Sequence, residues 1–506
     1  MLRKIRIVLA SLCFVGITLL FLDFTGTAHA WLGYLARVQL VPALLALHVG
    51  IVAALLLLTL LFGRIYCSVV CPLGVMQDLF GRAGRRARRH RYSWSPARTE
   101  LRYAMLALFA AALVAGVGSL AALLEPYSAY GRIAQNLLAP LWGWGNNLLA
   151  YFAERADSYA FYATEVWMRS AATFAVAAAT FAGVGWLAWR NGRTWCNTVC
   201  PVGTLLGLLS RHSLFRPVID TSKCNGCGLC ARNCKASCID SERHAIDYSR
   251  CVVCMDCLDR CSRGAITYAR RRKAAPSEEG APVPAGSPAQ ADKHAPADSG
   301  RRTFLAGLGL VAAQVARAQR RKKTDGGLAV ILDKQVPERA TRIVPPGSGG
   351  IRRFAQHCTG CQLCVAACPN GVLRPSGGLV TLMQPEMSYE RGYCRPECTR
   401  CSEACPAGAI VRISAAEKSS TQIGHAVWLR ANCLPLTDGV KCGNCARHCP
   451  AGAIAMVRSA AADPASPEIP SVDAERCIGC GACENLCPAR PFSAIYVEGH
   501  ERHRII

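Results

Sequence analysis

The spacing of the cysteines constrains this chain more than any other feature. Two segments have the same pattern, Cys358-x2-Cys361-x2-Cys364-x3-Cys368-Pro369 and Cys477-x2-Cys480-x2-Cys483-x3-Cys487-Pro488. This is the bacterial-ferredoxin run, in which three thiolates hold one [4Fe–4S] cluster and the fourth reaches a neighbouring cluster. Of the 30 cysteines, six blocks of four follow this spacing or come close to it. The sequence therefore predicts six [4Fe–4S] clusters in small domains built around them.

Four further blocks depart from the plain run: two keep its spacing but lack the proline, and two have a widened first gap, Cys394-x3-Cys398 and Cys433-x8-Cys442. They comprise Cys224, Cys227, Cys230 and Cys234; Cys251, Cys254, Cys257 and Cys261; Cys394, Cys398, Cys401 and Cys405; and Cys433, Cys442, Cys445 and Cys449. Zinc sites also use Cys-x2-Cys pairs, but they need no third cysteine at the next x2 step. Disulfide scaffolds are short secreted chains without this repeat. Iron–sulfur ligation is therefore favoured over both.

The crossed ligation of two-cluster ferredoxins predicts how the fourth cysteines are shared. In the first pair of blocks, Cys261 would join Cys224, Cys227 and Cys230, and Cys234 would join Cys251, Cys254 and Cys257. In the C-terminal region the gaps between blocks are nearly equal. Spacing there leaves open whether adjacent or nested blocks exchange their fourth cysteine.

Four apolar stretches predict four transmembrane helices, because each is close to the ~20 residues that cross a bilayer. They cover residues 7–24, 41–62, 103–124 and 171–189. Arginine is concentrated between the second and third stretches, at Arg82, Arg85, Arg86, Arg88, Arg89, Arg91, Arg98 and Arg102, whereas the outer loops carry Arg37, Arg132 and Arg155. This positive-inside pattern places the N-terminus and the Arg-rich loop in the cytoplasm. It also accounts for much of the net charge of +25 without a nucleic-acid partner.

The membrane part contains an internal repeat. Residues 63–74 and 192–203 both read Gly-Arg-x-aromatic-Cys-x3-Cys-Pro-x-Gly, with cysteines at Cys67, Cys71, Cys196 and Cys200. Such a repeat suggests two hairpins related by a pseudo-twofold axis with a site near it. Four thiols meeting there could hold a further metal or cluster, or act as a dithiol relay. The alternative is that each turn only ends a span.

Residues 273–300 are rich in Pro, Ala and Ser without apolar periodicity, which predicts a disordered linker. The segment 301–319 then begins Arg301-Arg302 and continues into a short apolar run and a small-x-small site at Ala316 to Ala318. Twin arginines before such a run are typical of a Tat export signal. A helix at a domain edge is the alternative, and the basic residues at 320–323 argue against export.

The sequence lacks Cys-x2-Cys-His and a Gly-x-Gly-x2-Gly turn after a strand, so it predicts no c-type haem and no nicotinamide or flavin site. Electrons would then enter from a quinol or a partner protein. The outer loop after the third stretch offers Glu125 as a proton acceptor and Tyr127, Tyr130 and Arg132 as hydrogen-bond donors for a quinol. An interfacial belt of aromatic residues is the alternative.

These motifs resemble two known groups of proteins. Residues 1–270, with four spans, two Cys-x3-Cys-Pro turns and a two-cluster module, resemble the NapH and MauN membrane ferredoxin proteins. Residues 301–506 resemble the NapG and MauM ferredoxin-type proteins. The resemblance implies quinol oxidation at the membrane and electron delivery to a periplasmic acceptor, with a redox role for the two Cys-x3-Cys-Pro turns. The chain departs from both groups in joining them.

The predicted fold is therefore an α-helical membrane domain followed by small α+β ferredoxin-like domains. The predicted domains are 1–210, four transmembrane helices; 211–272, a two-cluster ferredoxin domain; 273–300, linker; 301–319, Tat-like segment; and 320–506, a four-cluster domain. We expect an inner-membrane electron-transfer protein with the 211–272 domain cytoplasmic and the 320–506 domain periplasmic. The expected partners are the quinone pool and a periplasmic redox enzyme or cytochrome c. An accessory reductase that supplies electrons to mature a periplasmic metalloenzyme, as in the NosR, CcoG and MauMN group, is the alternative.

Overall fold

The computed structural model describes residues 1–88, 92–271, 323–325 and 329–506. One compact unit comprises Met1–Ala269 with Leu332–Ile506, and a second comprises Arg270–Ile331. In the second unit, β5 (Lys323–Asp325) pairs with β6 (Ala329–Ile331) in an antiparallel hairpin. The predicted linker at 273–300 and the predicted Tat-like segment at 301–319 lie outside the described residues.

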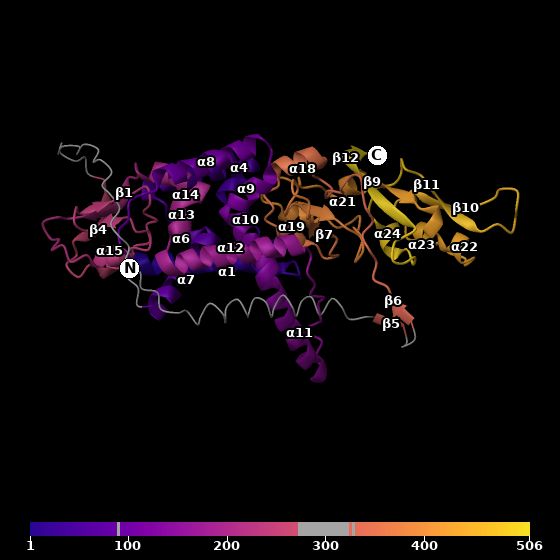
Figure 1. Ribbon diagram of the computed structural model, residues 1–506, viewed down its shortest axis with the longest axis horizontal. Coiled ribbons are helices and arrows are strands. Elements are labelled where there is room, and N and C mark those ends of the chain that lie inside the picture. The colour runs from indigo at the N-terminus through magenta and orange to yellow at the C-terminus, as the bar shows by residue number, and fades with distance from the viewer. Residues whose placement is uncertain (89–91, 272–322, 326–328) are drawn as a thin grey trace, which may run out of the picture. The chain divides into compact units, whose positions relative to one another are not determined.

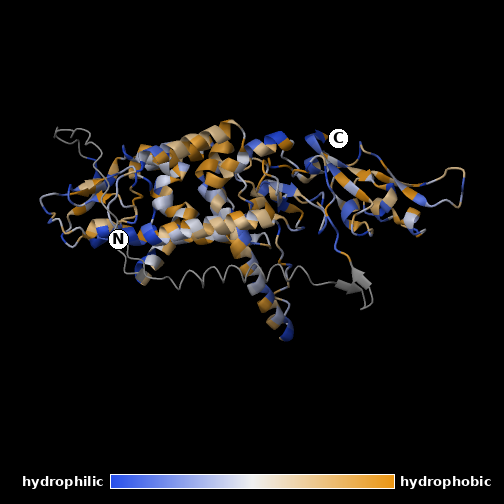
Figure 2. Cartoon of the chain, viewed as in Figure 1, coloured by the Kyte–Doolittle hydropathy of each residue, from blue (hydrophilic) through white to orange (hydrophobic). Residues whose placement is uncertain are grey.

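Within the described residues, two helices are long and apolar enough to cross a membrane, α1 (Leu2–Leu22) and α12 (Ala171–Asn191). Only 33% and 28% of their most apolar windows are buried. The helices are dominated by hydrophobic colour in Figure 2, and exposed side chains of α1 include Leu9, Leu12 and Val15. A core helix would bury such residues, so these exposed faces fit an apolar surrounding better than water.

The other two predicted spans are interrupted, so four transmembrane helices are not confirmed. The stretch 41–62 divides into α4 (Leu40–Leu45) and α5 (Val49–Phe62), with Leu47 at φ 55° between them. The stretch 103–124 divides into α8 (Thr99–Val114) and α9 (Gly118–Leu124), with Gly116 at φ 72°. A positive φ ends the i to i−4 hydrogen-bond ladder. Hydropathy misses both breaks because the residues stay apolar through them.

Shorter helices complete the helical part (Figure 1). They are α2 (Thr27–Leu32), α3 (Tyr34–Arg37), α6 (Ile65–Val69), α7 (Pro72–Arg88), α10 (Pro126–Ile133) with the π-turn η1 (Ala134–Leu138), α11 (Ala139–Arg155), α13 (Thr194–Thr198) and α14 (Pro201–Ser210). Helix α7 lies along α12, where Phe80 and Phe181 pack edge to face at 5.4 Å. Gly84 of α7 allows this approach, because a Cβ there would overlap the Trp189 backbone.

Short strands and one-turn helices make up the first cysteine module. Strand β1 (Phe215–Ile219) pairs with β4 (Ile266–Arg270), and β2 (Ile239–Asp240) with β3 (Ala245–Ile246). The helices are α15 (Leu229–Asn233) and α16 (Asp256–Arg260), and each carries the third cysteine of its block.

The C-terminal block repeats this style of fold. Its elements are α18 (Ile351–His357), α19 (Leu363–Ala367), β7 (Leu373–Pro375), β8 (Pro385–Met387), α20 (Arg400–Ala404), α21 (Ala415–Ser419), β9 (Thr421–Trp428), η2 (Arg430–Asn432), α22 (Leu434–Thr437), α23 (Asn444–Arg447), β10 (Ile454–Arg458), β11 (Glu468–Val472), α24 (Ala482–Leu486) and β12 (Ile495–Ile505). The antiparallel pairs are β7 with β8, β9 with β12 and β10 with β11. Ferredoxin-like α+β domains are thus present as predicted.

Candidate metal centres

The four blocks with plain or nearly plain spacing share one local turn. The residue after the second cysteine is left-handed in each, and the third cysteine follows on a one-turn helix. These residues are Gly228, Met255, Gln362 and Gly481. The corresponding Thr399 and Gly443 in the two widened blocks have negative φ, −110° and −155°. The widened first gap is therefore accompanied by a different turn.

In the first module the thiols gather in the crossed arrangement. Cys224, Cys227, Cys230 and Cys261 line one cavity. The thiols that act most strongly on Cys257 are Cys254, Cys251 and Cys234, ahead of Cys230 of the first group. Cys238 adds a fifth sulfur beside this second group, with its Sγ 3.5 Å from that of Cys234.

In the C-terminal block, the fourth cysteine of each block lies with the first cysteines of the adjacent block. One cavity is lined by Cys368 with Cys394, Cys398 and Cys401, and another by Cys449 with Cys477, Cys480 and Cys483. Electrostatic range joins Cys405 to Cys358, Cys361 and Cys364, and joins Cys487 to Cys433 and Cys445. The two pairs of blocks meet where the Cys394 N–H donates to the Cys480 carbonyl over 2.9 Å. The structure thus favours the adjacent exchange that spacing left open.

These groups suit a cluster better than one ion. Among the described residues, no three His, Cys, Asp or Glu side chains are placed to hold a single metal ion. A cubane keeps its four thiolates further apart. Backbone N–H groups also point at the sulfurs, from Ala453 to Cys449 and from Ala494 to Cys487, both over 3.3 Å. Four thiols with N–H donors are the donor set of a [4Fe–4S] cluster.

Burial would keep some of these thiols protonated without a cluster. It raises the pKa of Cys254 and of Cys480 to about 12 in each case. Ligation requires thiolates, so cluster insertion would release protons at neutral pH.

The two Cys-x3-Cys-Pro turns meet, as their repeat predicts. Cys67, Cys71, Cys196 and Cys200 are all buried, and the other three thiols act electrostatically on Cys200. We call these four residues the thiol tetrad. Each turn reaches into the other: Arg64 donates to the Cys196 carbonyl over 3.4 Å, and Arg193 to the Cys67 carbonyl over 2.5 Å. This reciprocal exchange is the pseudo-twofold relation inferred from the sequence.

Donors also reach the sulfurs of the tetrad. Gln77 Nε2 lies 3.1 Å from Cys196 Sγ, and the Gly203 N–H lies 3.3 Å from Cys200 Sγ. A Cβ at Gly203 would overlap the Cys196 carbonyl and the Arg64 guanidinium. The final glycine of the motif is therefore needed for the arginine exchange.

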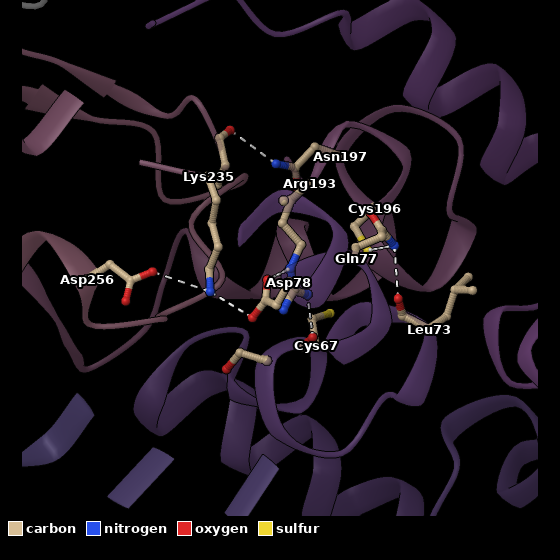
Figure 3. Close-up of polar contacts among 12 residues, drawn as sticks. Cys67, Leu73, Gln77, Asp78, Arg193, Cys196, Asn197, Lys235 and Asp256 are labelled. Carbon is tan, nitrogen blue, oxygen red and sulfur yellow. Dashed lines mark hydrogen bonds and ion pairs between the residues drawn. The ribbon is translucent and has the colours of Figure 1, made fainter. Parts of the chain in front are cut away.

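Asp78 connects the tetrad to the first cysteine module (Figure 3). Its carboxylate receives Arg193 Nε at 2.7 Å, Lys235 Nζ at 2.7 Å and Arg6 at 3.2 Å. Lys235 follows the ligand candidate Cys234 and also pairs with Asp256 at 3.4 Å. The sequence reading missed this network. One feature of the sequence pointed to this network: Asp78 is the single acidic residue between residues 63 and 99, among many arginines.

The predicted quinol residues are all buried, with exposed fractions of 0–1%. Glu125 caps α10 by accepting the Tyr127 and Ser128 N–H groups, and Tyr130 shares a hydrogen bond of 2.5 Å with Thr18. Arg132 donates to the Ala122 carbonyl over 2.8 Å. A headgroup would have to displace packed side chains to reach them. The quinol site stays a prediction.

Two family profiles match the chain. A 4Fe-4S binding domain matches residues 45–91 and 173–220, which contain the two Cys-x3-Cys-Pro turns. A 4Fe-4S dicluster domain matches residues 357–419 and 440–490, in the C-terminal block. Bound [4Fe–4S] clusters are thereby indicated, without fixing their number. No solved structure matches.

Relatives include the ferredoxin-type protein NapF of Escherichia coli, 31% identical over 182 residues, which covers 35% of this chain and 99% of NapF. MauM, the methylamine utilization ferredoxin-type protein of Methylophilus methylotrophus, is 30% identical over 35% of this chain and 85% of its own. NapG of E. coli is 29% identical over 33% and 77%, respectively. The predicted resemblance to NapG and MauM is confirmed. The chain spans only 33% of another relative, the uncharacterized protein MJ0749 of Methanocaldococcus jannaschii, at 37% identity over 16% of this chain.

Proposed function

The chain belongs to the family of ferredoxin-type proteins that includes NapF, NapG and MauM, and its activity is iron–sulfur electron transfer. We propose that it carries single electrons from the quinol pool to a periplasmic oxidoreductase. In this proposal it spans a bacterial inner membrane and holds six [4Fe–4S] clusters on the twenty-four block cysteines. The thiol tetrad is a further redox centre. The 4Fe-4S binding domain profile matches the two turns that carry the tetrad, which favours a cluster there over a dithiol relay.

One observation carries the proposal. A single buried core contains Cys234 and Cys257 of the first module, Cys67, Cys71 and Cys200 of the tetrad, and Cys361 of the C-terminal block. The same core includes Tyr66, Tyr127 and Tyr130. A bound cluster supplies one-electron chemistry with little rearrangement. The chain supplies a dry, packed medium that holds the centres in sequence.

The contacts of the two modules support their assignment to opposite sides. Lys235 of the first module pairs with Asp78 on α7, the helix that leads into the Arg-rich loop. The C-terminal block instead contacts the outer-loop side, where Asn136 donates to Gln362 over 2.9 Å and Arg169 to the Val365 carbonyl over 2.9 Å. A cytoplasmic first module and a periplasmic C-terminal block follow from the positive-inside rule.

The test is reduction of the clusters in membrane vesicles. With menaquinol or ubiquinol analogues as the only donor, we expect the absorbance of oxidised clusters to bleach in both modules. Protease added to spheroplasts should cleave beyond residue 332. Failure of both quinols to reduce any cluster, or protection of that region, would contradict the proposal.

An accessory reductase for metalloenzyme maturation is the second candidate. The observation that favours it is at the first module, where Cys227 is exposed while the predicted quinol residues are covered. A soluble donor could approach that centre directly. Cluster reduction by a low-potential soluble ferredoxin, but not by quinols, would select this function.

A further inference from the structure

Helix α10 of the helical part closes over the first cysteine turn of the C-terminal block. Gly131 faces Cys361, because a Cβ at Gly131 would overlap the Cys361 carbonyl oxygen. Asn136, five residues further on, donates to the Gln362 side chain over 2.9 Å. Cys358 lies against the neighbouring helix, with its carbonyl 3.2 Å from a Cβ built at Gly118. These contacts place two helices of the membrane part directly on the Cys358–Cys361 turn.

Several donors at this contact have no partner. The Tyr127 hydroxyl, Arg132 Nε and Nη2, and Gln362 Nε2 are buried without a hydrogen bond to any described residue. Tyr127 and Arg132 are 0% exposed and Gln362 is 1% exposed. A buried donor without a partner destabilises the fold, and an uncompensated buried charge does so more strongly. Donors gathered in this way imply an acceptor that belongs at the site.

The acceptor lies on the cysteine side. Cys361 and Cys405 both act electrostatically on the Tyr127 hydroxyl, and Cys361 acts on the Arg132 guanidinium. The charge of Glu125 acts on Arg132 more strongly than that of Cys361, but the Glu125 oxygens accept the N–H groups that begin α10 and leave Arg132 Nε and Nη2 without a hydrogen bond. A thiolate-bound [4Fe–4S] cluster is an anion with sulfur acceptors, so it fits both the spare donors and the buried positive charge.

We propose that Tyr127 and Arg132 of α10 donate hydrogen bonds to the cluster held by Cys358, Cys361, Cys364 and Cys405, and so set its reduction potential from the membrane part. The inference rests on the proposed cluster assignment. It makes Tyr127 and Arg132 positioning and tuning residues of an iron–sulfur centre, where the sequence suggested contact with a quinol. Donors to cluster sulfur stabilise the more negative reduced state, so the pair raises the potential.

The experiment compares Tyr127→Phe and Arg132→Gln with Tyr130→Phe in the full-length, detergent-solubilised protein. Tyr130 is a matched control on the same helix, because its hydroxyl is bonded to Thr18. Potentials are read by EPR-monitored redox titration, and a Cys361→Ser variant identifies the signal of this cluster. We expect at least a threefold loss in the one-electron reduction equilibrium in the first two variants, which is roughly 28 mV more negative at 59 mV per tenfold change. Tyr130→Phe should keep the parent potential.

Iron and acid-labile sulfide are measured in every variant. Equal content with an unmoved potential in Tyr127→Phe and Arg132→Gln would overturn the inference and leave the cluster assignment standing. An equal shift in Tyr130→Phe would also overturn it. If Cys361→Ser retains the iron, sulfide and EPR signals of the parent, the cluster assignment itself is wrong and the inference falls with it.

Discussion

The two cysteine modules differ in how deeply the charges that hold them to the helical part are buried. The first module is held by charges, with Arg3 on Asp256 at 2.8 Å and Lys235 on the buried Asp78 at 2.7 Å. The C-terminal block is held by close backbone approach at Gly118 and Gly131 and by the amide pair of Asn136 and Gln362. Buried donors without a partner occur at both contacts, among them Arg193 Nη2 at the first and Arg132 Nε at the second. The ion pair at the second contact, Arg391 with Glu165 at 3.0 Å, is exposed. The first contact therefore depends more on buried charge than the second does.

The largest effect should come from removing the tetrad that lies between the two contacts. The double variant Cys67→Ser/Cys196→Ser should lose iron and acid-labile sulfide and stop electron transfer between the modules, while each module remains reducible by dithionite. Cys13→Ser is the control, because Cys13 lies on α1 outside every cysteine group. Unchanged metal content and unchanged turnover would show that the turns only end the helices.

The next effect tests the ionic contact. Asp78→Asn keeps the shape but removes the carboxylate that Arg193 and Lys235 share; Lys235 keeps Asp256, and Arg193 loses its ion pair. Breaking a buried pair costs ~3–5 kcal/mol, since it leaves buried charge uncompensated. We expect loss of that free energy of unfolding in detergent, measured by denaturant titration. Asp220→Asn, at an exposed pair with Lys223, should change it little. An equal loss of free energy of unfolding in Asp78→Asn and Asp220→Asn would show that the buried ion pair is no more stabilising than the exposed one.

A smaller effect tests the close-packed contact. Gly131→Ala places a Cβ against the Cys361 carbonyl and 2.8 Å from the Phe21 ring. Overpacking of this kind costs ~1–3 kcal/mol. The melting temperature should fall, and protease should release the C-terminal block sooner. In α11, Gly145→Ala meets nothing within 4 Å and should not destabilise the protein. A Gly131→Ala protein as stable as Gly145→Ala would show that the contact is loose.

The smallest expected effect is a loss of stability in acid that is confined to the C-terminal block. Burial, and then the charge of His500, lowers the pKa of His503 in β12 to about 4. The unfolded chain takes up a proton near pH 6.5 and the folded chain does not. Stability from His503 is therefore full above pH 6.5 and is lost as pH falls toward 4.

At pH 5 the free energy of unfolding of the C-terminal block should be lower by on the order of 1 kcal/mol, a figure reduced because His503 is partly exposed. His503→Gln should remove that part of the slope in a pH series of unfolding curves. His357→Gln, elsewhere in the same block, is the control. A slope identical in the parent and in His503→Gln would contradict the assignment.

The sequence alone determined the local chemistry. Cys-x2-Cys spacing predicts the turn at Gln362 and Gly481, because short-range φ preferences and ligand reach are local properties. It also predicted the meeting of the two Cys-x3-Cys-Pro turns, since a repeat implies related surroundings. Hydropathy identified α1 and α12, but it could not see the breaks at Leu47 and Gly116.

Only the tertiary structure decided which distant groups meet. Equal gaps between blocks permit two ways of sharing Cys405 and Cys487, and folding selects the adjacent one. Asp78 finds Lys235 across 157 residues, and Asn136 finds Gln362 across 226. Such pairings depend on how whole elements pack, which spacing along the chain does not encode. The sequence placed Tyr127 and Arg132 in an outer loop, and the structure shows them buried against the Cys358–Cys361 turn.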